Sequence, residues 1–197
     1  MYRFATSITT TLLVLFACAQ LLGASAPEDA VAEPKAAPVA ADPSQKDAPP
    51  RLVDGWPSID ALVDDFVKAL GKDDKLMLGR LRVSEDEYRN LVIPGTVEPG
   101  KPPRQNSEKV KEFFWQMLDG KSRYYGDELR ERFKGKELKV KKVSFSGPTQ
   151  HYAWYDAHGE TRAVLEDEDG KEWDLDAGYI VEVAGAFKFM SYAHDRD

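Results

Sequence analysis

Apolar residues in the first half of the folded region recur at helical spacing. After Trp56 and Pro57 they follow one another at steps of three and four, which predicts one face of an amphipathic helix. Ser58 is a suitable N-cap for this helix, and Gly71 a suitable end. The residues of the predicted buried face are Ile59, Leu62, Val63, Phe66, Val67 and Leu70.

Two short helices are predicted next. The first begins at Asp73 or Asp74 and presents Leu76, Met77 and Leu81. The second begins at the capping box of residues 84–87, in which a serine is followed three positions later by a glutamate. Pro94 is expected to stop it, because proline lacks the N–H that a helix interior needs.

A longer helical segment follows the Pro/Gly-rich loop of residues 94–106. It is predicted to start at about Ser107, with Gly120 interrupting or kinking it and residues 122–133 forming another helical stretch. The residues expected to share the buried face of its first part are Val110, Phe113, Phe114, Met117 and Leu118.

After Gly135 the apolar period changes to two, which predicts β-strands. Leu138 and Val140 alternate in one phase and Val143 and Phe145 in the other, a slip that predicts a β-bulge near residues 141–142. Further strands are predicted at residues 149–157, 160–166 and 171–177, with a type I turn at 156–159 and a closing hairpin at 179–192.

All connections between these strands are short, so we expect one antiparallel sheet that meanders. Helices first and strands afterwards indicate an α+β fold. A bent antiparallel sheet wrapped around the N-terminal helices would leave a cone-shaped interior.

The pattern differs before residue 53. Residues 1–26 combine one arginine, an apolar run and a small-residue exit, which predicts a signal peptide. Residues 27–52 are rich in Ala and Pro without an aromatic residue, and they are predicted to be a disordered tether. The folded domain is then expected to span residues 53–197.

The signal predicts a place outside the cytoplasm: periplasm, cell envelope or secreted. Four modes of release stay open. Cleavage after Ala26 is disfavoured by the following Pro27, and cleavage after Ala24 puts Leu22 at the −3 position. Cys18 ends a segment that resembles a lipobox and is a candidate for lipidation; the segment is otherwise an uncleaved anchor. We expect membrane contact only through a lipidated or uncleaved N-terminus.

Composition narrows the chemistry. Cys18 is the only cysteine, so the folded domain has no disulfide, no thiol nucleophile and no Cys-bound zinc. The formal net charge of −7 argues against a nucleic-acid partner. The acidic run of residues 166–170 departs from a calcium loop at its first and last ligand positions, and an acidic hairpin turn is expected instead. We therefore predict no metal and no cofactor.

Residues 56–192 resemble the NTF2-like superfamily, a cone-shaped α+β fold also found in ketosteroid isomerase and scytalone dehydratase. The resemblance rests on the order of elements, the bulged first strand and the closing hairpin of residues 180–189, where an aromatic–Lys pair soon follows a turn glycine. It implies a cone that enzymes of this superfamily use with a pocket Asp or a His–Asp pair. Other members bind ligands or proteins, so the fold alone does not fix a function.

Few titratable residues suggest catalysis. His151, His158 and His194 have no partner at helical or strand spacing. Asp64 and Asp65 lie on the first predicted helix and are expected on its solvated side.

The favoured prediction is an exported, non-catalytic module that binds a small molecule or a protein partner. One alternative is an isomerase- or dehydratase-like enzyme that uses a pocket Asp or His beside a donor such as Tyr88, Tyr124 or Tyr152. The other is a homodimeric scaffold that pairs sheets face to face. The residues predicted to bind a ligand are Tyr88, Phe114, Trp115, Tyr124, Tyr152 and Trp154.

Overall fold

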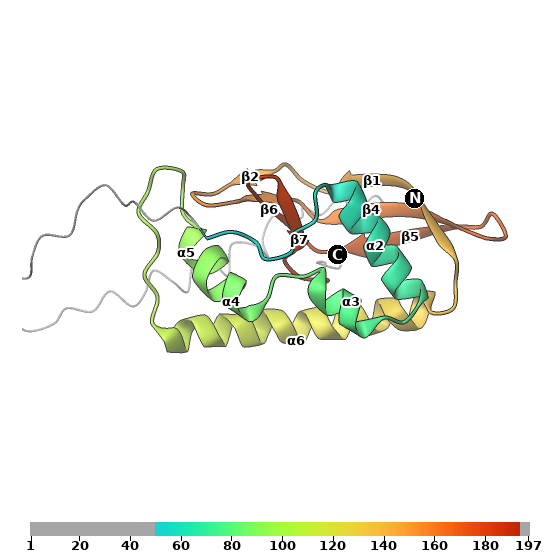
Figure 1. Ribbon diagram of the computed structural model, residues 1–197, viewed down its shortest axis with the longest axis horizontal. Coiled ribbons are helices and arrows are strands. Elements are labelled where there is room, and N and C mark those ends of the chain that lie inside the picture. The colour runs from blue at the N-terminus through green and yellow to red at the C-terminus, as the bar shows by residue number, and fades with distance from the viewer. Residues whose placement is uncertain (1–49, 194–197) are drawn as a thin grey trace, which may run out of the picture. The chain divides into compact units, whose positions relative to one another are not determined.

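The computed structural model describes residues 50–193 (Figure 1). It has an α+β architecture in which helices precede antiparallel strands, as predicted. The predicted signal peptide with Cys18, most of the predicted tether and His194 lie outside the described residues.

The first helices begin where the sequence predicts. Helix α2 (Ile59–Gly71) starts after Ser58, whose hydroxyl accepts the N–H of Ala61 at 3.1 Å, and it buries the predicted apolar face. Helix α3 (Lys75–Arg80) starts after Asp74. It buries Leu78, whereas Leu76 is 79% exposed, so the prediction that Leu76 packs inward was wrong.

The capping box at Ser84 is confirmed and opens a short helical segment. It continues through α4 (Glu85–Glu87), the π-helical turn η1 (Tyr88–Val92) and α5 (Ile93–Gly95). Pro94 lies in the first turn of α5, where its missing N–H has no helical partner to lose.

Helix α6 (Glu108–Phe133) is one continuous helix of 26 residues. The prediction that Gly120 ends it and a separate stretch follows was therefore wrong. In Figure 1, α6 runs along one edge of the domain, below α3, α4 and α5.

The strands form two antiparallel sheets instead of the one meandering sheet that was predicted. The first sheet has the order β1-β4-β5, and the predicted bulge in β1 is confirmed between Val140 and Lys142. The second has the order β2-β3-β6-β7. The strands are β1 (Leu138–Phe145), β2 (Gln150–His151), β3 (Asp156–His158), β4 (Thr161–Asp167), β5 (Glu172–Ala177), β6 (Ile180–Val183) and β7 (Ala186–Phe189).

The predicted strand at residues 149–157 is divided. A turn at residues 152–155, closed by the N–H of Tyr152 on the carbonyl of Tyr155 at 2.9 Å, separates β2 from β3. Residues 156–158 then pair with β6 and do not form the predicted type I turn. The chain thus leaves the first sheet after β1, visits the second, and returns for β4 and β5.

Two apolar clusters hold these layers together. The larger lies between α2, the end of α6 and the strands, and the ring of Phe66 packs against the rings of Phe189 and Tyr192 at 4.8 Å each. The smaller joins η1 to the second sheet and contains Leu91, Tyr155 and Val181.

Candidate functional site

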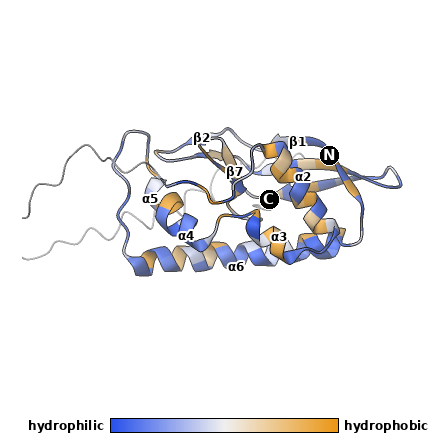
Figure 2. Cartoon of the chain, in the orientation of Figure 1, coloured by the Kyte–Doolittle hydropathy of each residue, from blue (hydrophilic) through white to orange (hydrophobic). Residues whose placement is uncertain are grey.

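Helix α6 exposes apolar side chains along its outer side. Val110, Phe113, Met117 and Tyr124 are 37%, 57%, 40% and 61% exposed. They lie three, four and seven positions apart, a spacing that places them on one face of a helix. We call these four residues the α6 stripe. Figure 2 shows hydrophobic positions alternating with polar ones along this helix.

The direction of the α6 stripe follows from the continuity of the helix. Ser122, Gly126, Leu129 and Phe133 are buried and fix the rotation of the C-terminal half. Extending that face toward the N-terminus at 3.6 residues per turn brings Trp115 inward, and the positions of the stripe fall on the opposite side.

The predicted buried face of α6 was accordingly wrong. Val110, Phe113 and Met117 are exposed, and Phe114 and Leu118 are half-buried. The sequence pattern was interpreted with a break at Gly120, which freed the first half from the phase of the second.

The inner side of α6 is held at both halves. Trp115 packs against Tyr88 with ring centroids 5.8 Å apart, and the guanidinium of Arg82 lies 5.3 Å from the Trp115 ring while pairing with Asp119. Farther along, the hydroxyl of Ser122 accepts the backbone N–H of Tyr192 at 3.0 Å. These contacts fix the helix, so the stripe is a pre-formed surface.

Gly120 lies within the stripe, between Met117 and Tyr124. A Cβ added there would meet nothing within 4 Å. Glycine in a helix interior costs about 1 kcal/mol relative to alanine, so no packing inside this chain accounts for it. It leaves a gap in the row of exposed apolar side chains.

Charges of both signs border the stripe. Exposed Lys109 and Lys121 lie toward its start and middle, and exposed Asp127 and Glu131 lie toward its end. A surface for nucleic acid or anionic lipid carries one sign of charge, whereas this border suits another protein surface of mixed charge.

The aromatic residues predicted to bind a ligand do not converge on one place. Tyr88 and Trp115 pack together between η1 and α6, and burial raises the pKa of Tyr88 to about 12. Tyr124 is on the outer side of α6, where its hydroxyl donates to Glu128 at 3.3 Å. The ring of Phe114 lies 5.9 Å from that of Phe113.

Two other members of that predicted set lie by the second sheet. Tyr152 packs against Tyr155 at 4.8 Å between ring centroids, and its hydroxyl donates to Gln150 at 2.6 Å. Trp154 covers Gly95, where a Cβ would come within 2.9 Å of the Trp154 Cβ. Both side chains are parts of the smaller apolar cluster.

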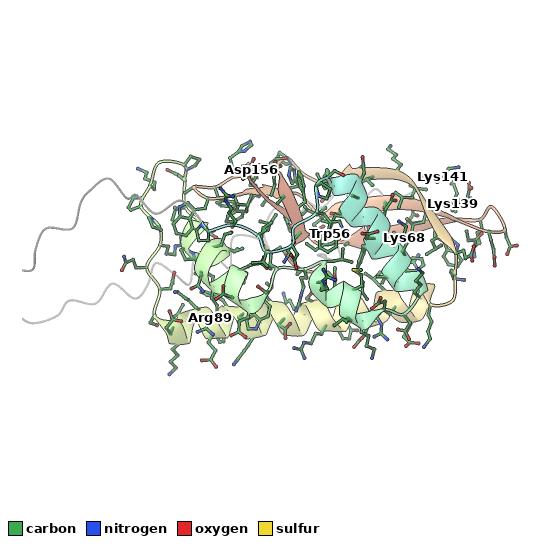
Figure 3. All side chains as sticks on the ribbon, viewed as in Figure 1. Trp56, Lys68, Arg89, Lys139, Lys141 and Asp156 are labelled. Atoms are coloured by element: carbon green, nitrogen blue, oxygen red, sulfur yellow. The ribbon has the colours of Figure 1, made fainter. Side chains whose placement is uncertain are left out.

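The expectation that the histidines lack partners was wrong for the two that are described. His151 Nδ1 lies 2.8 Å from Asp156 Oδ1 across the β2–β3 pair. Asp156 lies on the second sheet, near the upper edge of the domain in Figure 3. These partners come from strands whose pairing local spacing does not reveal.

His158 is held more tightly than His151. Its Nε2 lies 2.9 Å from Glu182 Oε2, and its Nδ1 lies 3.1 Å from the hydroxyl oxygen of Thr149. The rings of Phe145 and Phe187 lie 5.7 Å and 6.0 Å from the imidazole. Because Phe145 belongs to the first sheet and Phe187 to the second, His158 joins the two sheets.

The aspartates of α2 lie as predicted. Asp64 is exposed, and Asp65 is half-exposed and accepts the indole N–H of Trp56 at 2.9 Å. That hydrogen bond, with a smaller contribution from Lys68, lowers the pKa of Asp65. In Figure 3, Trp56 lies beside α2.

Among residues 50–193, no group of three or more His, Cys, Asp or Glu side chains is placed to hold a metal ion. No helix in that range is long and apolar enough to cross a membrane. Comparison of the chain with protein-family models, with curated proteins and with solved structures finds no match.

Proposed function

We propose that this chain is an exported, non-catalytic interaction domain that binds an apolar helix of a protein through the α6 stripe. The observation that carries the proposal is the exposure of Phe113, Met117 and Tyr124 on one face of a rigidly held helix. Contiguous apolar surface of this kind marks interaction sites, because leaving it in water costs free energy.

The rest of the proposal comes from the sequence. The N-terminal pattern supports export, and the tether supports attachment of the domain at a distance from a membrane or wall. Helices that precede antiparallel strands, together with the bulge in β1, support a cone-shaped domain of the NTF2-like kind. The function does not depend on that kinship.

The binding function takes precedence over the enzymatic one. Each described histidine is held by a carboxylate, Asp156 or Glu182, and His158 also contacts Thr149. Such pairs tie strands of a sheet together, whereas the α6 stripe has no packing role within the described residues.

Site-specific photo-cross-linking in the cells that make the protein tests this function. A benzophenone amino acid at Phe113 is compared with one at Leu76, an equally exposed apolar position on α3. We expect Phe113 to give a protein adduct that maps by mass spectrometry to an apolar helical segment, and Leu76 to give none. Equal adducts at both positions, adducts with lipid alone, or no adduct at Phe113 would contradict the proposal.

A further inference from the structure

We propose that the helix bound by the α6 stripe is α6 of a second copy of this chain, in antiparallel orientation about a two-fold axis between Met117 and Gly120. This inference rests on the proposed function and names its partner.

The first support is the spacing of the stripe with its glycine included. Positions 110, 113, 117, 120 and 124 alternate in steps of three and four. This is the spacing of the apolar seam in two helices that pack along their lengths, because it keeps the seam facing the partner helix. A stripe with this repeat fits another helix better than a flat sheet or a loop.

The second support is that the stripe complements itself. In the antiparallel pair, Met117 of each copy faces Gly120 of the other, so a large flexible side chain enters the gap left by a missing one. Phe113 of each copy faces Tyr124 of the other, which makes two aromatic pairs. The exposed glycine, unexplained within one chain, thus acquires a packing role.

The third support is the distribution of charge along the helix. The antiparallel pair brings exposed Lys109 of one copy beside exposed Asp127 of the other. A parallel pair would set Lys109 beside Lys109 and Asp127 beside Asp127, which repel. Opposite charges therefore favour the antiparallel orientation and disfavour the parallel one.

The expected dimer is weak. A single pair of helices buries less than the roughly 800 Å² per partner of a standard stable interface. We therefore expect a dissociation constant in the micromolar range, which a common attachment surface would offset by raising the effective concentration of the domain.

Sedimentation equilibrium of the chain recovered from cells tests the inference with two glycine variants. Gly120→Ala adds a methyl group where Met117 of the second copy must fit, and we expect it to weaken dimerisation by about tenfold or more. Gly79→Ala is the matched control on α3, where a Cβ also meets nothing within 4 Å. Both changes favour the helix, so loss of dimer in Gly120→Ala does not reflect unfolding.

Disulfide cross-linking then tests the orientation, in a Cys18→Ser background that lacks other cysteines. Val110→Cys mixed with Asp127→Cys should give a mixed disulfide, and neither variant alone should dimerise covalently. In the antiparallel pair, two copies of position 110 are separated by about 25 Å along the helix axis.

Three results would overturn the inference: a wild-type monomer throughout the micromolar range, equal dimerisation of Gly120→Ala and wild type, or self-cross-linking of Val110→Cys. If the chain is monomeric but Phe113 still cross-links to a helix of another protein, the proposed function stands and this inference fails. If Phe113 also gives no adduct, both fail.

Discussion

The carboxylate of Glu87 is the most fully engaged charged group of the domain. Its oxygens accept the backbone N–H groups of Val53 and Ser84 at 2.7 Å each, and both lie within 3.1 Å of Lys188 Nζ. The side chains of Glu87 and Lys188 are 3% and 6% exposed. One residue therefore connects the start of the domain, a helix N-terminus and strand β7.

Removing the cation from this pair tests its role in stability. In Lys188→Met, Glu87 stays buried with its charge and keeps only two backbone donors. We expect the free energy of unfolding, measured by urea denaturation, to fall by about 3–5 kcal/mol. The second change in Glu87→Gln/Lys188→Met removes the leftover charge and should restore part of the loss.

An exposed ion pair supplies the control for that variant. Lys141 pairs with Glu166 at 2.8 Å on the first sheet, far from Arg89 in Figure 3, and its side chain is 49% exposed. Lys141→Met should cost at most about 1 kcal/mol, because water already solvates that pair. Equal losses in Lys188→Met and Lys141→Met would show that burial of the first pair does not matter.

At the scale of the element, local signals predicted the starts of the helices well. Ser58 and the capping box at Ser84 each act through residues within four positions, and both were found where the sequence placed them. The bulge in β1 was predicted for the same reason, since a slip of phase is visible within one strand.

Signals that depend on distant partners were not predicted. The division of β2 from β3 is set by pairing with β6, more than 20 residues away. The candidate site was missed for a related reason. Exposed Phe113 and Met117 have the composition of a core, and only the continuity of α6 through Gly120 shows that they face outward.

The turn between α2 and α3 is joined to α6 through Asp73. Its carboxylate accepts hydrogen bonds from Arg130 Nε at 2.7 Å and pairs with Lys134 Nζ at 2.8 Å. These donors, Lys134 first and Arg130 next, hold the pKa of Asp73 below its ordinary 3.8. The ionised form therefore stabilises the fold at pH values above about 4, and this contribution is lost as pH falls through the folded pKa.

Asp73→Asn should separate this ionic contribution from the shape of the turn. Asp73 has a φ of 56°, which asparagine also adopts readily. We expect the variant to melt below wild type at pH 7, and the difference between the two melting temperatures to narrow as pH falls toward about 2. Thermal unfolding followed by circular dichroism measures both.

Asp64→Asn on the exposed side of α2 is the control for that series and should leave the melting temperature nearly unchanged at every pH. A constant difference between Asp73→Asn and wild type over the whole pH range would show that Asp73 acts through turn geometry alone.

At the scale of the whole domain, the path of the chain binds the two sheets into one unit. The first sheet takes β1, β4 and β5, and the second takes the segments between and after them, so neither sheet is continuous in sequence. His158 adds a side-chain link, since it lies between Phe145 of one sheet and Phe187 of the other.

This interleaving predicts that both apolar clusters unfold together. The four tryptophans report on different parts: Trp56 and Trp173 pack against the larger cluster, Trp154 against the smaller, and Trp115 on the inner side of α6. In 5-fluorotryptophan-labelled protein, the four native ¹⁹F resonances, assigned by single Trp→Phe variants, should lose intensity at one urea midpoint. If the Trp154 resonance disappears at a lower urea concentration than that of Trp173, the second sheet opens independently. The α6 stripe, which is backed by both clusters through Trp115 and Leu129, would then lose its rigid support before the domain unfolds.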